Sequence, residues 1–248
     1  TIDPSSFIID QGSEGSIALS DFRGSVRFAA ADGSVQADLN GRLGSLKPGA
    51  SPTGGAAALG PAGPMAIKAD LKGVLDSSGA PTVGAMKGTA SVSMKETALR
   101  YDGQTSSLRS FDLSLDARDA SGAVAVAFAV DGATREQIEV GELAGRLTLG
   151  RDPPGPMGIS ASQVAAAIER GRVAIKGGDE PFSAEGIVAN FAIGTGGRAT
   201  FSVAAETAMG SGRGSVSGEG SLENLFNDDL AMTLGKAVGS ARLSVERA

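Results

Sequence analysis

The sequence predicts an all-β fold: an antiparallel meander forming a curved, groove-like or sandwich-like sheet, with one or two short helices. Three observations support this prediction. Apolar residues recur at every second position in many short runs, glycine-containing turn signals separate the runs, and only two segments have helical spacing. The chain has 37 glycines among its 248 residues. We expect roughly twelve to fifteen strands, and the absence of a fixed repeat argues against a β-helix or propeller.

The alternating runs extend from Ile17 to Val245. In chain order, the clearest runs consist of Val35, Ala37, Leu39; Ile67, Ala69, Leu71; Phe111, Leu113, Leu115; Val124, Val126, Phe128, Val130; Ile187, Ala189, Phe191, Ile193; and Phe201, Val203, Ala205. Small and polar residues hold the opposite parity, so one face of the sheet should be apolar and the other polar. The turn signals lie at residues 31–34, 77–79, 119–122, 131–132 and 194–197.

Two segments have the spacing of a helix. In the first, Ser162 can cap a helix over residues 163–170 that Gly171 ends. The second runs from Leu222 to about Leu234, with leucines and one phenylalanine on a single helical face. A strand through residues 230–234 is the alternative for the second segment.

The chain reads as one β-rich domain over residues 1–248, with a flexible proline- and glycine-rich insertion at 47–64. Its first residue is Thr1, and we expect it to be a segment of a larger protein. The longest apolar stretch, residues 123–130, is far shorter than the roughly 20 residues of a membrane-spanning helix and reads as a strand.

Composition excludes several functional classes. The chain has no His, Cys or Trp, so it cannot supply a His-based triad, a thiol nucleophile or a zinc or iron–sulfur ligand set. Its formal net charge of -6 argues against binding to a nucleic-acid backbone. The lack of cysteine fits an exported protein. We therefore expect no enzyme activity, no cofactor and no metal.

Acidic and glycine-rich segments are the remaining candidates for chemistry. The carboxylate pairs at 179–180 and 228–229 read as solvated charges, although carboxylates alone could serve a carbohydrate-acting enzyme. Asp112, Asp116 and Asp119 come nearest to a calcium loop but alternate as an outward strand face would. The segment 210–220 has neither the spacing nor the strand–turn–helix context of a phosphate loop, and it resembles an exposed strand pair.

In segments 16–28, 111–117, 141–149 and 218–222, glycine interrupts or borders runs of alternating apolar residues. In these segments the chain resembles the AsmA-like and TamB-like envelope proteins. The resemblance implies a curved β-groove whose apolar lining carries phospholipid across the bacterial periplasm or serves outer-membrane biogenesis. It further implies a membrane anchor outside this chain, possible protein partners in the envelope, and no nucleic acid.

The groove interpretation assigns lipid contact to the apolar face of four predicted strands. The residues expected to contact lipid are Phe111, Leu113, Leu115, Val124, Val126, Phe128, Val130, Ile187, Phe191, Ile193, Phe201 and Val203. One-sided alternation is equally typical of a closed core. The alternative function is therefore a structural β-rich module of a cell-surface or multi-subunit assembly.

Overall fold

The computed structural model describes residues 2–10, 16–45, 63–101, 104–118, 122–152, 159–177, 180–194, 197–224 and 237–247. These residues form thirteen strands of one sheet. The strands are β1 (Ile2–Asp10), β2 (Ser16–Ala29), β3 (Ser34–Ser45), β4 (Gly63–Lys72), β5 (Lys87–Tyr101), β6 (Gln104–Asp116), β7 (Val124–Arg135), β8 (Ile138–Arg151), β9 (Ile159–Ile175), β10 (Phe182–Ile193), β11 (Ala199–Met209), β12 (Gly212–Glu223) and β13 (Val238–Arg247).

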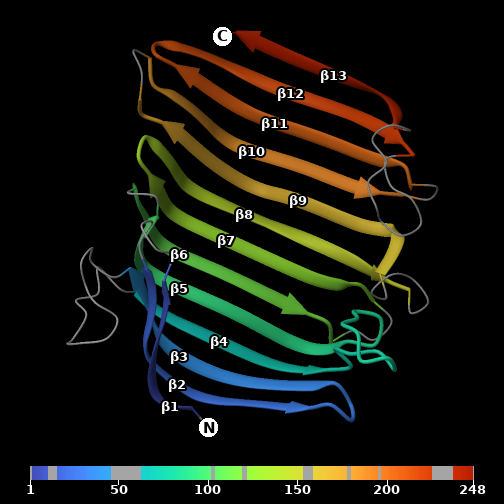
Figure 1. Cartoon of the computed structure of the whole chain (residues 1–248). Helices are drawn as coiled ribbons and strands as arrows, with labels where there is room; N and C mark the ends of the chain where they lie inside the picture. The colour runs from blue at the N-terminus through green and yellow to red at the C-terminus, as the bar shows by residue number, and fades with distance from the viewer. Residues whose placement is uncertain are drawn as a thin grey trace.

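The sheet is a meander in which each strand pairs antiparallel with its neighbours in the sequence (Figure 1). The strands follow the order β1 to β13 across the sheet, so the two chain ends lie at opposite edges. The predicted all-β, antiparallel class is confirmed. The turn predicted at residues 31–34 joins β2 to β3. The segment 210–220 is not a strand pair, because residues 210–211 form the turn after β11 and residues 212–220 belong to the single strand β12.

The helix predicted over residues 163–170 is wrong, because this segment lies within strand β9. Its residues pair on both sides: Ala166 is opposite Leu147 of β8 and opposite Phe191 of β10. Two flanking strands therefore satisfy the backbone of a segment whose alanines would otherwise favour a helix. The backbone hydrogen bonds of the sheet therefore outweigh the local helix propensity of this segment.

Several other predictions fall at the edges of the described residues. Leu222 lies near the end of strand β12, and residues 225–234 of the second predicted helix lie outside the described part. The carboxylates at 179, 228 and 229 and Asp119 also lie outside it. Gly63 and Pro64 begin β4 and do not belong to the predicted insertion, whose residues 47–62 are also outside. The turn predicted at residues 131–132 is wrong, since both residues lie inside β7.

A single sheet has little interior. Among the described residues, the buried apolar side chains are Phe22, Leu39, Ala117, Val124, Ala144, Ile193 and Ala199. The chain exposes 14605 Å² of surface, whereas a compact monomer of this mass exposes about 10,000 Å². Most apolar side chains of the sheet are therefore only half-buried, and the described strands form one layer, as in the groove-like and not the sandwich-like alternative.

Candidate functional site

The candidate site is the apolar face of the sheet, which we define by its cross-strand rows. One row runs from Leu115 of β6 through Val126, Leu147 and Ala166 to Phe191 and Phe201 of β10 and β11. Directly opposite residues point to the same side of a sheet. The same row continues towards β2 through small residues, Ala90, Ala69 and Ala37, to Val26.

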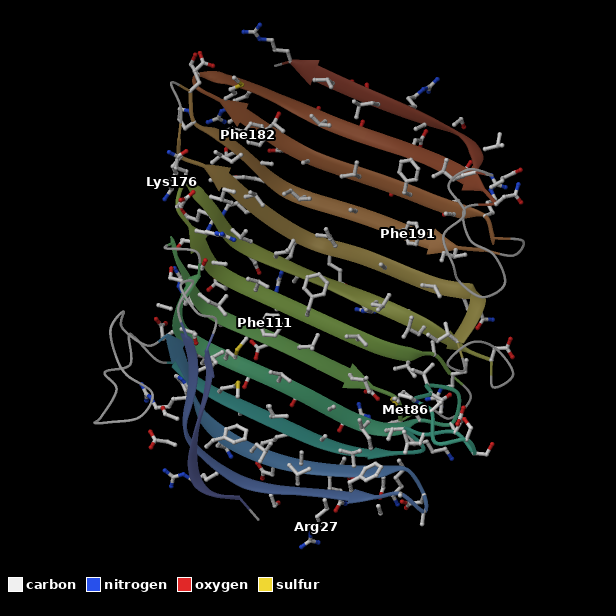
Figure 2. All side chains as sticks on the ribbon, viewed as in Figure 1. Arg27, Met86, Phe111, Lys176, Phe182 and Phe191 are labelled. Carbon is white, nitrogen blue, oxygen red and sulfur yellow. The ribbon has the colours of Figure 1, made fainter. Side chains whose placement is uncertain are left out.

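A second row lies two residues away from the first along each strand. It joins Leu39 and Ile67 to Val92, Leu113 and Phe128, and it reaches Val203 through Ile168 and Ala189. Figure 2 shows Phe111 and Phe191 over the same broad side of the sheet. The rows make the apolar face continuous from β2 to β11, and Val216 opposite Ala205 extends it to β12.

The structure places all twelve predicted lipid-contact residues on this face. The pairing register fixes eleven of them, and Ile187 is placed by contact, because a Cβ on Gly171 would lie 3.1 Å from Ile187 Cβ and 3.2 Å from Leu143 Cδ1. Ten of the twelve keep part of their surface exposed. Val124 and Ile193 do not, with exposures of 0% and 6%.

Val124 and Ile193 belong to a row that closes one margin of the apolar face. The row is Val124, Leu149, Val164, Ile193 and Ala199. Beside it, Arg151 Nη2 donates a hydrogen bond of 3.0 Å to the Ala117 carbonyl, and Ala117 is 1% exposed. Packing at this margin seals these side chains, so they support the face and do not offer contact surface.

Glycines let aromatic rings lie flat on the apolar face. A Cβ on Gly145 would lie 2.7 Å from Phe128 Cζ, and one on Gly220 would lie 2.5 Å from Phe201 Cζ. Phe22 covers Gly41 in the same way, at 2.6 Å from its Cδ2. Such distances are shorter than van der Waals contact, so each ring occupies the space that a side chain on the neighbouring strand would need. The face is thus low and smooth where it is aromatic.

A band of kinks crosses the sheet near one end of the strands. Asp21 of β2, Glu96 of β5, Gly132 of β7 and Gly186 of β10 have positive φ angles of 52°, 45°, 61° and 59°. Register shifts accompany the kinks in β2 and β10. Each kink shifts the side-chain alternation by one residue. Apolar residues on both sides of the band therefore stay on the same face.

Beyond the band, the apolar face closes into a recess of about 300 Å³. Its apolar lining is Leu43, Met94, Leu108, Ala133, Ile138 and Val140. Leu43 and Ile138 lie on β3 and β8, five strands apart in the sheet order. The sheet must therefore curl towards the apolar face here, and β2 and β3 approach β5 to within 8 Å between Cα atoms.

Sequence reasoning missed this recess. The signal was present as a change of phase in the alternation: Leu143 and Leu147 have odd numbers, whereas Val140 and Ile138 on the same strand have even numbers. The phase change falls at Gly141, where a Cβ would lie 2.3 Å from Arg172 Nε. A glycine at a break in alternation therefore marks the kink.

The opposite face is polar and carries cross-strand ion pairs. Arg109 pairs with Asp131 at 3.1 Å, Arg146 with Glu169 at 2.9 Å, and Arg170 with Glu142 at 2.7 Å. Lys176 also pairs with Glu139, and this hydrogen bond lowers the pKa of Glu139. These side chains are largely exposed, so the pairs contribute little stability and mark a solvated surface.

Asp116 has the largest resolved pKa shift. A hydrogen bond from the Arg118 side chain, followed by one from the Arg118 backbone amide, lowers the pKa of Asp116 to about 2. Arg118 and Asp116 are two residues apart at the end of β6 and are exposed. The shift arises from a local turn contact, and a proton donor or acceptor for catalysis near neutral pH would need a raised pKa instead.

The polar face also has a hollow of about 670 Å³ near the C-terminal strands. Asn190, Ser202, Ser221, Glu219 and Arg242 are among its lining residues. Across the described residues, no cluster of three or more acidic side chains could hold a metal ion. Asp112 and Asp116 lie in strand β6.

Comparison with known proteins finds no matching family model, no matching curated protein and no matching solved structure. Within the described part of the chain, no helix has the length and apolar character needed to cross a bilayer.

Proposed function

We propose that the chain is a non-enzymatic lipid-handling groove whose apolar face binds the acyl chains of phospholipid. The observation that carries this proposal is the continuous apolar face in a sheet with one described layer. On that face Phe28 is 57% exposed, Val203 is 38% exposed and Ile138 is 50% exposed. Contiguous exposed apolar surface of this extent is typical of a binding surface for lipid or for another apolar partner.

The dimensions of the face suit acyl chains. Ten strand spacings separate β2 from β12, which gives a length of about 48 Å across the strands. One leaflet of a bilayer has a hydrocarbon thickness of about 15 Å, so the face can hold several acyl chains in succession. Each buried methylene contributes about 0.8 kcal/mol. The smooth contour left by rings that lie over Gly145 and Gly220 favours sliding contact along the face.

The polar face fits the same proposal, because its ion pairs and hydroxyls keep the outer side in water. This polar outer face and the resemblance to AsmA-like and TamB-like proteins together support a location in the bacterial periplasm. There the groove would move phospholipid between membranes or serve outer-membrane biogenesis, with a membrane anchor and protein partners outside this chain.

A matched pair of substitutions on β7 tests the proposal. Val126 lies on the apolar face between Leu115 and Leu147, and its neighbour Ala127 lies on the polar face between Ser114 and Arg146. After incubation with phosphatidylethanolamine–phosphatidylglycerol vesicles and reisolation, native mass spectrometry should find bound phospholipid on the parent chain and on Ala127→Asp. Val126→Asp should retain about a hundredfold less, because a charge against hydrocarbon costs about 3 kcal/mol.

Circular dichroism of both variants completes the experiment. In a lipid groove, Val126→Asp keeps its β spectrum, since its charge stays hydrated on an open surface. If the parent binds no phospholipid and Val126→Asp unfolds, the apolar face is a core that packs against protein, and the chain is a structural β-rich module instead.

A further inference from the structure

The recess beyond the band of kinks differs from the rest of the apolar face, because side chains from several strands surround it. Its lining comes from β3, β5, β6, β7 and β8, each of which pairs with a strand on both sides. Four apolar residues of the lining are half-buried, namely Leu43, Met94, Leu108 and Val140. Unlike the sealed row that contains Val124, the recess therefore offers apolar contact surface.

Three hydroxyl groups that line the recess already have hydrogen-bond partners within the chain. Thr97 is 3% exposed, and its Oγ1 donates a hydrogen bond of 3.1 Å to the Lys95 carbonyl. The hydroxyls of Ser107 and Thr134 hydrogen-bond to each other. A hydrocarbon in the recess would therefore leave none of these hydroxyls without a partner, so filling the recess carries no polar penalty from them.

The volume of the recess suits the end of a hydrocarbon chain. An apolar cavity of about 150 Å³ binds a benzene molecule. The recess, at about 300 Å³, is about twice as large and has room for roughly ten carbons. A single leucine or phenylalanine side chain from a partner protein would fill only part of this volume, whereas an acyl chain can fill it and continue out of it.

The recess is continuous with the open part of the apolar face. Met94 lines the recess and lies opposite Phe111 of β6. Phe111 in turn lies opposite Val130 of β7, and Figure 2 shows Phe111 on the broad side of the sheet. An acyl chain on the open face can therefore enter the recess past Phe111 and Met94 without leaving apolar contact.

We propose that this recess binds the methyl end of one acyl chain of a phospholipid that lies on the apolar face. The inference rests on the proposed lipid-handling function and adds a fixed position within the groove. The ester and the head group of the same phospholipid lie outside the recess, where the face is open to water. The recess thus holds one phospholipid by its chain end, and the regular part of the face holds others without a fixed position.

Photo-cross-linking from the two ends of an acyl chain tests this position. The probes are two phosphatidylethanolamines, one with a diazirine at the methyl end of an acyl chain and one with a diazirine beside its ester. After irradiation, peptide mass spectrometry should find the methyl-end label mainly on Leu43, Met94, Leu108 and Val140, and the ester-end label outside the recess. A methyl-end label that spreads evenly over the apolar face, or that is absent from the recess, refutes the inference and leaves the groove proposal intact. A chain that binds no phospholipid refutes both.

A matched pair of alanine substitutions separates the recess from the open face. Ala133 lines the recess, whereas Ala189 lies between Ile168 and Val203 on the open face. Ala133→Phe fills about half of the recess with its ring. It should lower methyl-end labelling of Met94 about tenfold or more, because each methylene that loses apolar contact weakens binding about fourfold. Ala189→Phe should leave this labelling unchanged.

Equal labelling of Met94 in the parent, Ala133→Phe and Ala189→Phe overturns the inference. Thermal melts establish that both variants fold. If Ala133→Phe does not fold, the label positions on the parent chain still decide the outcome.

Discussion

The two ends of the sheet have the same apolar alternation, but they differ in how far their apolar side chains are buried. At the N-terminal end, Phe22 is 8% and Leu39 is 7% exposed, and β2 and β3 approach β5 where the sheet curls. At the C-terminal end, Val203 is 38% and Leu243 is 71% exposed, and the β11–β13 pairings have no register shift. Curvature at the kinks therefore helps to shelter Phe22 and Leu39, whereas the same alternation leaves Val203 and Leu243 exposed where the sheet is regular.

The difference has a consequence for function. In the proposed groove, a sheltered recess would hold an apolar group in place, whereas an open, regular stretch would let it move along the face. The proposed groove would combine both properties in one sheet. Stability measurements can separate the two regions, because burial determines the cost of removing a side chain.

The largest expected effect compares two phenylalanines on the apolar side of β2. Phe22→Ala should lower the free energy of unfolding by about 3 kcal/mol, because the ring is 8% exposed and covers Gly41. Phe28→Ala should cost less than about 1 kcal/mol, since that ring is 57% exposed. Denaturant melts of the two variants measure the difference. Equal costs would show that the curl does not shelter this end.

The next effect tests the kink itself. Glu96 adopts a φ of 45° in the middle of β5, a conformation that costs a residue with a side chain about 1 kcal/mol relative to glycine. Glu96→Gly should therefore raise the free energy of unfolding by about 1 kcal/mol. Lys95→Gly, one residue earlier, should lower it by a similar amount because glycine in a regular strand is unfavourable. A lower free energy of unfolding for Glu96→Gly than for the parent chain would contradict a positive φ at residue 96.

Much of the fold could be predicted from the sequence, for a physical reason. Period-two alternation determines which residues share a face, so Phe111, Leu115, Val126 and Val130 are correctly predicted to share one side of the sheet. The prediction failed where a local signal competed with pairing. Ser162 and Gly171 resemble helix caps, yet β8 and β10 supply hydrogen bonds that a helix would otherwise make internally.

The kinks could not be predicted in the same way. Asp131–Gly132 reads as a turn because glycine at positive φ serves both a hairpin turn and a kink within a strand. Glu96 gives no signal in its residue type, since positive φ is uncommon for glutamate. The recess follows from strands that are distant in the sequence and meet only because the sheet curls. Contacts of this kind, between strands that are distant in the sequence, can be identified only in the folded structure.

The smallest expected effect concerns the polar face at the end of β6. Because the pKa of Asp116 in the folded chain is lowered to about 2 from a usual value of 3.8, its contact with Arg118 stabilises the fold above about pH 4 and loses that contribution as pH falls through about 2. Arg118→Ala removes the side-chain hydrogen bond and keeps the backbone one, so the pKa of Asp116 should rise part of the way towards 3.8. Carboxyl-detected NMR titration measures the change, and Arg146→Ala, which breaks the pair with Glu169, is the matched control. The same Asp116 pKa in the parent and in Arg118→Ala would assign the shift to the turn backbone alone.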